Sequence, residues 1–196
     1  GAIPKIMSDA LPVTLETSVG HDFIEDAAKR YEYYHTTQKR IPFDLKMMNT
    51  VTDGGLIDKS LTVYMAVTGG GKSRKMCHNA AGNLRDGYNV LYITMEMAEE
   101  RIAERIDANL LDTDIKELKL LSKEDYEEKI ARVKKTTKGK IIIKEYPTAG
   151  AGANHFRYLL NELRLKKNFK PDIIYIDYIN ICMSSRIKLG NNVNSY

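Results

Sequence analysis

Five consecutive residues in this sequence have the types and the order that phosphate chemistry requires. Gly69, Gly70 and Gly71 precede Lys72 and Ser73 in the stretch AVTGGGKS. Glycines carry no side chains to block a close approach of phosphate to the backbone. A lysine can reach the phosphate and neutralise its charge, and a serine hydroxyl can ligate Mg²⁺. We therefore predict a loop that binds the phosphates of a nucleotide. The alternative is a turn with a purely structural role.

Two carboxylates stand where such a loop would need them. Asp177 lies in the apolar run DIIYIDYINI, where burying a charge is costly unless a cation or hydrogen-bond donors are close. We predict that Asp177 holds the water shell of a Mg²⁺ ion, with a hydrogen-bonded structural aspartate as the alternative. Glu96, in LYITMEM, is predicted to polarise an attacking water. Its alternative role is to cap the helix that follows.

The elements that position these residues alternate between two patterns. From Leu61 onward, apolar runs typical of buried strands alternate with helical patterns, which predicts an α/β domain with a mainly parallel sheet flanked by helices. Parallel sheets bind ligands at the carboxyl edge of their strands, so the glycine loop, Glu96 and Asp177 are expected at that edge. The expected strands are LTVYMAV, NVLYITME, KIIIKEYP and DIIYIDYINI.

Four helices are expected in this domain. The first begins at Lys72 and runs to about Asp86, where Gly87 supplies a left-handed stop. The third begins after Ser122, which is predicted to act as an N-cap. The four segments are Lys72 to Asp86, AEERIAERIDANLL, SKEDYEEKIARVKKTT and Asn154 to Lys167.

The residues before this domain have a different character. Positions 1–20 read as an extended arm, whereas residues 21–38 carry apolar side chains at spacings of three and four, which predicts a helix with one apolar face. That face packs either on its own domain or on a neighbouring copy. The dipeptide Ile41-Pro42 breaks the helix. We therefore divide the chain into an arm and helix, 1–38, and a domain, 39–196.

Composition excludes several classes of protein. Of 196 residues, 43% are apolar and 29% charged, which fits a globular domain better than a disordered chain. No run approaches the roughly 20 apolar residues of a membrane span, and no secretory leader is visible, so we expect a cytoplasmic protein without a membrane partner. The net charge of +4 only weakly favours anionic partners. Cys77 and Cys182 lack metal-ligand spacing and are expected to be reduced and buried.

Four stretches together resemble a known family. They are IPFDLKMMNTVTDGGL, AVTGGGKS, GYNVLYITMEMAEERIAERIDANLL and NELRLKKNFKPDIIYIDYINICMSSRI. They are similar to the RecA-like ATPase domains of DnaB-type replicative DNA helicases, most closely to the T4-type phage branch. The likeness covers roughly Ile41 to Tyr196. The full phosphate-loop pattern has glycine six residues before the lysine, and Ala66 at that position looks ordinary for this branch.

The resemblance implies a RecA-like P-loop NTPase that forms a hexameric ring, hydrolyses ATP with Mg²⁺ and moves along single-stranded DNA to unwind a duplex. It implies that residues 21–38 form a linker helix that docks on the adjacent subunit. Lys72, Glu96 and Asp177 would be catalytic, and Ser73 and Asp177 would hold the metal, partly through water. The nucleotide would contact Thr68, Gly69, Gly70, Gly71, Lys72, Ser73, Arg74 and Arg105, although a solvated helix charge is the alternative for Arg105.

The last residues, SSRIKLGNNVNSY, fall where the family has a loop facing DNA in the ring channel. Arg186, Lys188 and Gly190 would contact DNA there, with a plain solvated loop as the alternative. The resemblance also implies a primase and a helicase loader as partners, and host-cell cytoplasm if a phage encodes the chain. The family's arginine finger and γ-phosphate sensor would lie past Tyr196. The ATPase domain is therefore expected to be incomplete and weakly active alone.

Three other functions remain open at this stage. A strand-exchange recombinase would share the RecA-like domain but form helical filaments, and the TMEM segment and linker helix disfavour it. A non-motor nucleotide-binding module would hydrolyse nucleotide slowly and without regard to DNA. A small-molecule kinase is disfavoured because no arginine-rich lid follows the central helices.

Overall fold

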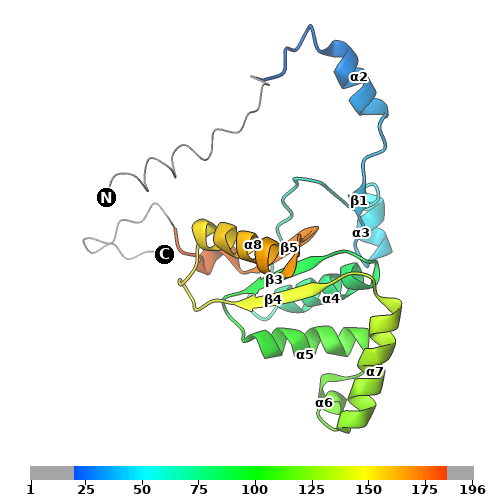
Figure 1. Ribbon diagram of the computed structural model, residues 1–196, viewed down its shortest axis with the longest axis vertical. Helices are drawn as coiled ribbons and strands as arrows, with labels where there is room; N and C mark the ends of the chain where they lie inside the picture. Colours follow the sequence, from blue (N-terminus) through cyan, green and yellow to red (C-terminus); the bar gives the residue numbers. More distant parts are fainter. Residues whose placement is uncertain (1–19, 185–196) are drawn as a thin grey trace, which may run out of the picture. The chain divides into compact units, whose positions relative to one another are not determined.

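The computed structural model describes residues 20–184, and its contacts divide the chain between Lys39 and Arg40. In the first unit, helix α2 spans Ala27–His35 and is shorter than the helix predicted over 21–38 (Figure 1). A turn precedes it, in which the carboxylate of Asp22 accepts backbone N–H bonds from Ile24 and Glu25. The expected arm lies outside the described residues apart from Gly20.

A small antiparallel pair opens the second unit. Strands β1 (Arg40–Ile41) and β2 (Leu56–Ile57) pair with each other and enclose the short helix α3 (Lys46–Val51). The side chain of Asn49 closes this loop, since it accepts from the backbone N–H of Phe43 and donates to the carbonyl of the same residue, both at 2.7 Å. The sequence patterns did not predict these three elements.

The central sheet confirms the predicted α/β architecture. Strands β3 (Val90–Thr94), β4 (Ile141–Glu145) and β5 (Ile173–Asp177) are all parallel and follow the order β4-β3-β5. Every residue of β3 is buried, as expected for a central strand covered on both faces. Three of the four predicted strands are therefore present.

Helices cover both faces of this sheet (Figure 1). Helices α4 (Lys72–Arg85) and α5 (Glu99–Leu110) pack with Val90 and Tyr92 on one face. Helix α8 (Ala153–Lys167) packs with Leu91 and Ile93 on the other face. The alternation of side chains along β3 thus divides the core into two layers.

In the α/β domain, the boundaries of the four predicted helices agree closely with the structure. Gly87 has a φ of 92° just after α4, which is the predicted left-handed stop. Helix α7 (Lys123–Thr136) begins after Ser122, whose hydroxyl accepts the backbone N–H of Asp125 at 3.1 Å. The single-turn helix α6 (Ile115–Leu118) was not predicted, because four residues are too few to show a helical period.

The strand predicted at LTVYMAV is wrong. Residues 61–67 form no strand, and Leu61, Val63, Met65 and Val67 are exposed. A strand exists only where a neighbouring backbone pairs with it. A cavity of about 610 Å³, lined by 56–66 and by 172–180, separates this segment from the outer edge of β5. Within the described residues, no backbone hydrogen bond pairs this segment with another strand.

Candidate functional site

The three glycines join segment 61–67 to helix α4. Gly71 is the N-cap of α4 and has a φ of 84°, which an L side chain rarely adopts. A Cβ on Gly70 would lie 2.9 Å from both the Cβ of Ala66 and the carbonyl oxygen of Val67. The tight turn therefore needs glycine at both positions, which the sequence supplies.

The loop delivers unpaired backbone N–H groups to one place. Helix α4 has 14 residues, and the first-turn N–H groups of Lys72, Ser73 and Arg74 have no acceptor within the helix. No side chain of the described residues caps this helix end. The partial positive charge of the end adds to these donors, so the loop has the geometry of an anion site.

Asp177 occupies the end of strand β5 and is only 1% exposed. Its Oδ2 accepts the hydroxyl hydrogen bond of Tyr92 at 3.0 Å, while its Oδ1 is buried and has no partner among the described residues. A buried carboxylate oxygen without a donor is costly, and a cation or its water shell removes that cost. Asp177 therefore suits the role of a Mg²⁺ ligand, because its hydrogen bond to Tyr92 leaves Oδ1 without a partner.

Lys72 and Asp177 line the same cavity of about 610 Å³. The ammonium nitrogen of Lys72 also lies 5.3 Å from the ring centre of Tyr178, the residue after Asp177. The fold thus brings together the lysine of the glycine loop and the carboxylate of β5, which are 105 positions apart in the sequence. Together they can balance the charges of a phosphate and a divalent cation.

Glu96 lies just past the end of β3 and is exposed. The turn that carries it is fixed by Thr94, whose hydroxyl donates to the carbonyl of Met97 at 2.8 Å and accepts its N–H at 3.1 Å. Thr94 pairs in register with Asp177, so Glu96 lies just beyond the sheet edge at which Asp177 lies. Glu96 is not among the residues that line the cavity with Lys72 and Asp177.

The alternative role of Glu96 as a helix cap finds no support. The N-cap of α5 is Ala98, whose own side chain makes no capping hydrogen bond. The backbone N–H of Glu99 is instead accepted by the carboxylate of Glu145 at 3.1 Å. The carboxylate of Glu96 is therefore available for another role.

Arg105 is half-buried on α5, and its charge affects the pKa of the Cys77 thiol on α4. Burial raises the pKa of the Cys77 thiol, and the positive charge of Arg105 opposes that rise. The side chain is thus not a fully solvated charge. The structure places it beside α4, without a contact to the glycine loop among the described residues.

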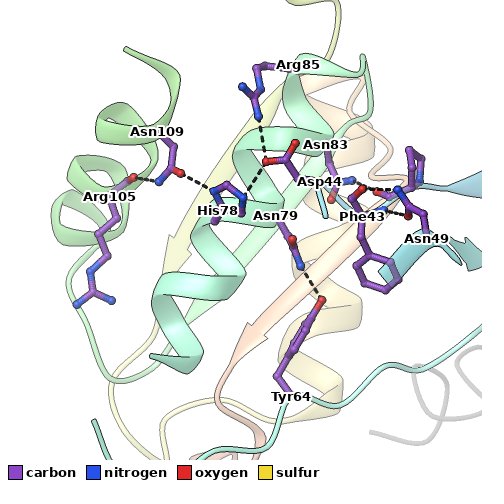
Figure 2. A network of polar contacts seen from close by, with 11 residues as sticks. Phe43, Asp44, Asn49, Tyr64, His78, Asn79, Asn83, Arg85, Arg105 and Asn109 are labelled. Carbon is purple, nitrogen blue, oxygen red and sulfur yellow. Dashed lines mark hydrogen bonds and ion pairs between the residues drawn. The ribbon is translucent and has the colours of Figure 1, made fainter. Parts of the chain in front are cut away.

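A polar network holds α4 against its surroundings (Figure 2). On α4, His78 bridges Asp44 and Asn109, with its Nε2 2.8 Å from the carboxylate and its Nδ1 2.7 Å from the amide oxygen. Arg85 forms an ion pair with Asp44 at 3.1 Å. In Figure 2 the Arg105 side chain points away from His78. This network fixes the helix that begins at the glycine loop.

The sequence patterns missed one residue of this site. Tyr92 contacts Asp177 from the centre of β3, and burial raises the pKa of its hydroxyl well above the usual value, so the hydroxyl stays a donor. A signal was present, because a tyrosine within a fully buried strand must place its hydroxyl against a polar group. Asp177, on the neighbouring strand β5, is that polar group.

The three residues predicted to contact DNA, Arg186, Lys188 and Gly190, lie outside the described residues 20–184.

The remaining predictions concern cysteines, metal clusters and membrane spans. Cys77 is buried as expected, Cys182 is only half-buried, and both are free thiols. Among the described residues, no three His, Cys, Asp or Glu side chains gather into a metal cluster. None of the described helices is long and apolar enough to cross a membrane.

Comparison with known proteins agrees with these observations. Residues 41–194 match the family described as the DnaB-like helicase C terminal domain. The chain is 47% identical over 199 residues to a DnaB-like replicative helicase of Enterobacteria phage T4, an alignment that includes 100% of this chain and 42% of the relative. The chain thus spans less than half the length of that relative. It belongs to the family of DnaB-like helicase C-terminal domains.

Proposed function

We propose that this chain is the motor part of a replicative DNA helicase, which couples hydrolysis of ATP to movement along single-stranded DNA and to duplex unwinding. Membership of the DnaB-like family supports the proposal, as does the name of the phage T4 relative. The observation that carries it is the cavity shared by Lys72 and a buried Asp177 with one unpaired carboxylate oxygen. That pairing suits a metal-bound nucleotide.

The glycine loop is the proposed phosphate site. The backbone N–H groups of Gly69 and of Gly71 to Arg74 would surround the phosphates, with Thr68 at the start of the loop, while the N–H of Gly70 donates to the carbonyl of Val67. Lys72 would neutralise phosphate charge from inside the cavity. The hydroxyl of Ser73 and the carboxylate of Asp177 would hold the ion, partly through water. Bound Mg²⁺ would supply neutralisation of the charge that develops on the phosphates during hydrolysis.

Glu96 is the proposed general base. Glu96 is exposed and does not cap α5. It lies just past the end of β3, at the sheet edge where β5 ends with Asp177. It would orient a water molecule and accept its proton. Arg105, half-buried on α5, is the proposed further contact to the nucleotide.

The assembly and the DNA contacts are proposals carried by the family. Helix α2 would serve as the linker that docks on an adjacent subunit of a hexamer, and it exposes Tyr31 and Tyr34. Arg186, Lys188 and Gly190 would contact the phosphates of single-stranded DNA, which suits movement without regard to sequence. Primase and a loader are the proposed protein partners.

The DNA contact can be tested by charge removal. Arg186→Ala with Lys188→Ala in the full-length protein should lower the affinity for single-stranded DNA and reduce the dependence of affinity on salt. Lys134→Ala with Lys135→Ala, at the end of α7, removes the same charge and is the matched control. Equal affinities and salt slopes in both double variants would contradict the DNA contact.

Steady-state ATPase activity of the full-length protein, with and without single-stranded DNA, tests the motor function. The proposal predicts strong stimulation by DNA that disappears in Glu96→Gln. Slow hydrolysis that DNA leaves unchanged would instead favour a non-motor nucleotide-binding module. Electron microscopy separates the remaining rival, because a helicase forms closed rings and a recombinase forms open filaments on DNA.

A further inference from the structure

A buried line of three side chains connects the helix after the glycine loop to the candidate metal ligand. It runs from Cys77 on α4 through Tyr92 on β3 to Asp177 on β5. The Cys77 sulfur lies 3.8 Å from the Tyr92 hydroxyl oxygen, which lies 3.0 Å from Oδ2 of Asp177. All three residues are at most 1% exposed. Bulk water therefore does not reach the contact between the Tyr92 hydroxyl and Oδ2.

The hydroxyl of Tyr92 contacts one oxygen of Asp177 and leaves the other without a partner. The terminal torsion of an aspartate is broad, so a carboxylate without a hydrogen bond can rotate. One donor to Oδ2 fixes that torsion. The contact therefore determines where Oδ1 lies relative to the cavity that Lys72 also lines.

We propose that Tyr92 is a positioning residue, whose hydroxyl holds the carboxylate of Asp177 so that Oδ1 is free for the divalent cation or its water shell. The inference rests on the proposed role of Asp177 in binding Mg²⁺. Tyr92 itself is fully buried and is not among the residues that line the cavity. Partners of this kind orient metal ligands, and their loss typically lowers metal affinity by about 10- to 100-fold.

A neighbouring tyrosine provides a matched control. Tyr175 on β5 stacks on Tyr92 with ring centres 5.8 Å apart, and it is also buried. Its hydroxyl donates to the side-chain oxygen of Asn83 on α4 at 2.6 Å, whereas the hydroxyl that contacts Asp177 is that of Tyr92. Tyr175→Phe therefore removes a buried hydroxyl and one hydrogen bond from the same part of the core, but leaves the carboxylate of Asp177 as it is.

The experiment measures how much a metal tightens nucleotide binding to the full chain. The probe is AMP-PNP, a nucleotide that resists hydrolysis, titrated by calorimetry with and without Mn²⁺. The ratio of the two dissociation constants gives the contribution of the metal. Asp177→Asn should reduce that ratio strongly, Tyr92→Phe should reduce it by about tenfold, and Tyr175→Phe should leave it unchanged. Excess Mn²⁺ should restore nucleotide affinity to Tyr92→Phe.

The double variant separates positioning from a general structural role. If Tyr92 acts through the carboxylate, Tyr92→Phe has no further effect on the ratio in the Asp177→Asn background. An unchanged ratio in Asp177→Asn would contradict the proposed metal role itself. A reduced ratio in Asp177→Asn, together with a ratio in Tyr92→Phe equal to that of Tyr175→Phe, would overturn the role of Tyr92 alone.

Discussion

The two halves of the candidate site are built in opposite ways. The glycine loop is exposed and offers backbone N–H groups, because its centre consists of three glycines without side chains. Asp177 is buried and offers one side-chain oxygen, held by Tyr92 from another strand. The loop therefore depends on local backbone geometry, whereas the carboxylate depends on packing between distant segments. Substitutions in the two halves should accordingly fail in different ways.

Lys72→Ala should have the largest effect, because it removes the charge that the loop directs into the cavity. Loss of a charged contact to phosphate should weaken triphosphate binding at least about tenfold and stop turnover. Calorimetric titration and an ATPase assay measure both. Lys123→Ala, exposed at the start of α7, is the control. Normal DNA-stimulated hydrolysis by Lys72→Ala would refute the phosphate-loop assignment.

Glu96→Gln should separate chemistry from binding. The amide keeps the size of the side chain but cannot accept a proton, so turnover should fall by roughly 10² to 10⁴ while nucleotide affinity stays unchanged. Glu100→Gln, on the exposed side of the first turn of α5, is the matched control. Turnover in Glu96→Gln close to that of Glu100→Gln would exclude the general-base role.

Two glycines at opposite ends of α4 test whether the loop works through its backbone. Gly71 and Gly87 both have a positive φ, and an added Cβ would meet no atom closer than 3.7 Å at either position. Alanine should therefore lower the free energy of unfolding by about 1–2 kcal/mol in both cases. Only Gly71→Ala should also weaken nucleotide binding. Equal nucleotide affinities in Gly71→Ala and Gly87→Ala would contradict the phosphate role of the loop.

The smallest effect is expected at the segment before the loop. Tyr64 accepts a hydrogen bond at 2.6 Å from the side-chain amide of Asn79 on α4, which is buried (Figure 2). Tyr64→Phe leaves that donor unpaired and should cost about 1 kcal/mol of unfolding free energy. Chemical denaturation measures it, with the exposed Tyr158→Phe as control. Equal stability of the two variants would mean that the contact does not anchor the segment.

The same contrast explains what the sequence could predict. The stop at Gly87 and the cap at Ser122 were predicted because each depends on residues within one helical turn. The strand at 61–67 was wrong because pairing depends on a second backbone, and alternating apolar residues do not specify one. The contact between Tyr92 and Asp177 was missed for the same reason, since it joins residues 85 positions apart.

The most direct test asks whether the glycine loop and Asp177 form one site for a metal-bound nucleotide. Nuclear magnetic resonance of the 22.3 kDa chain with Mn²⁺ and AMP-PNP reports which backbone amides lie near the bound ion, because paramagnetic broadening falls steeply with distance. We predict broadening at Gly69 to Ser73 and also at Asp177 and Tyr178, with both sets lost in Lys72→Ala. Broadening confined to the loop, with the amides at the end of β5 unaffected, would contradict the account.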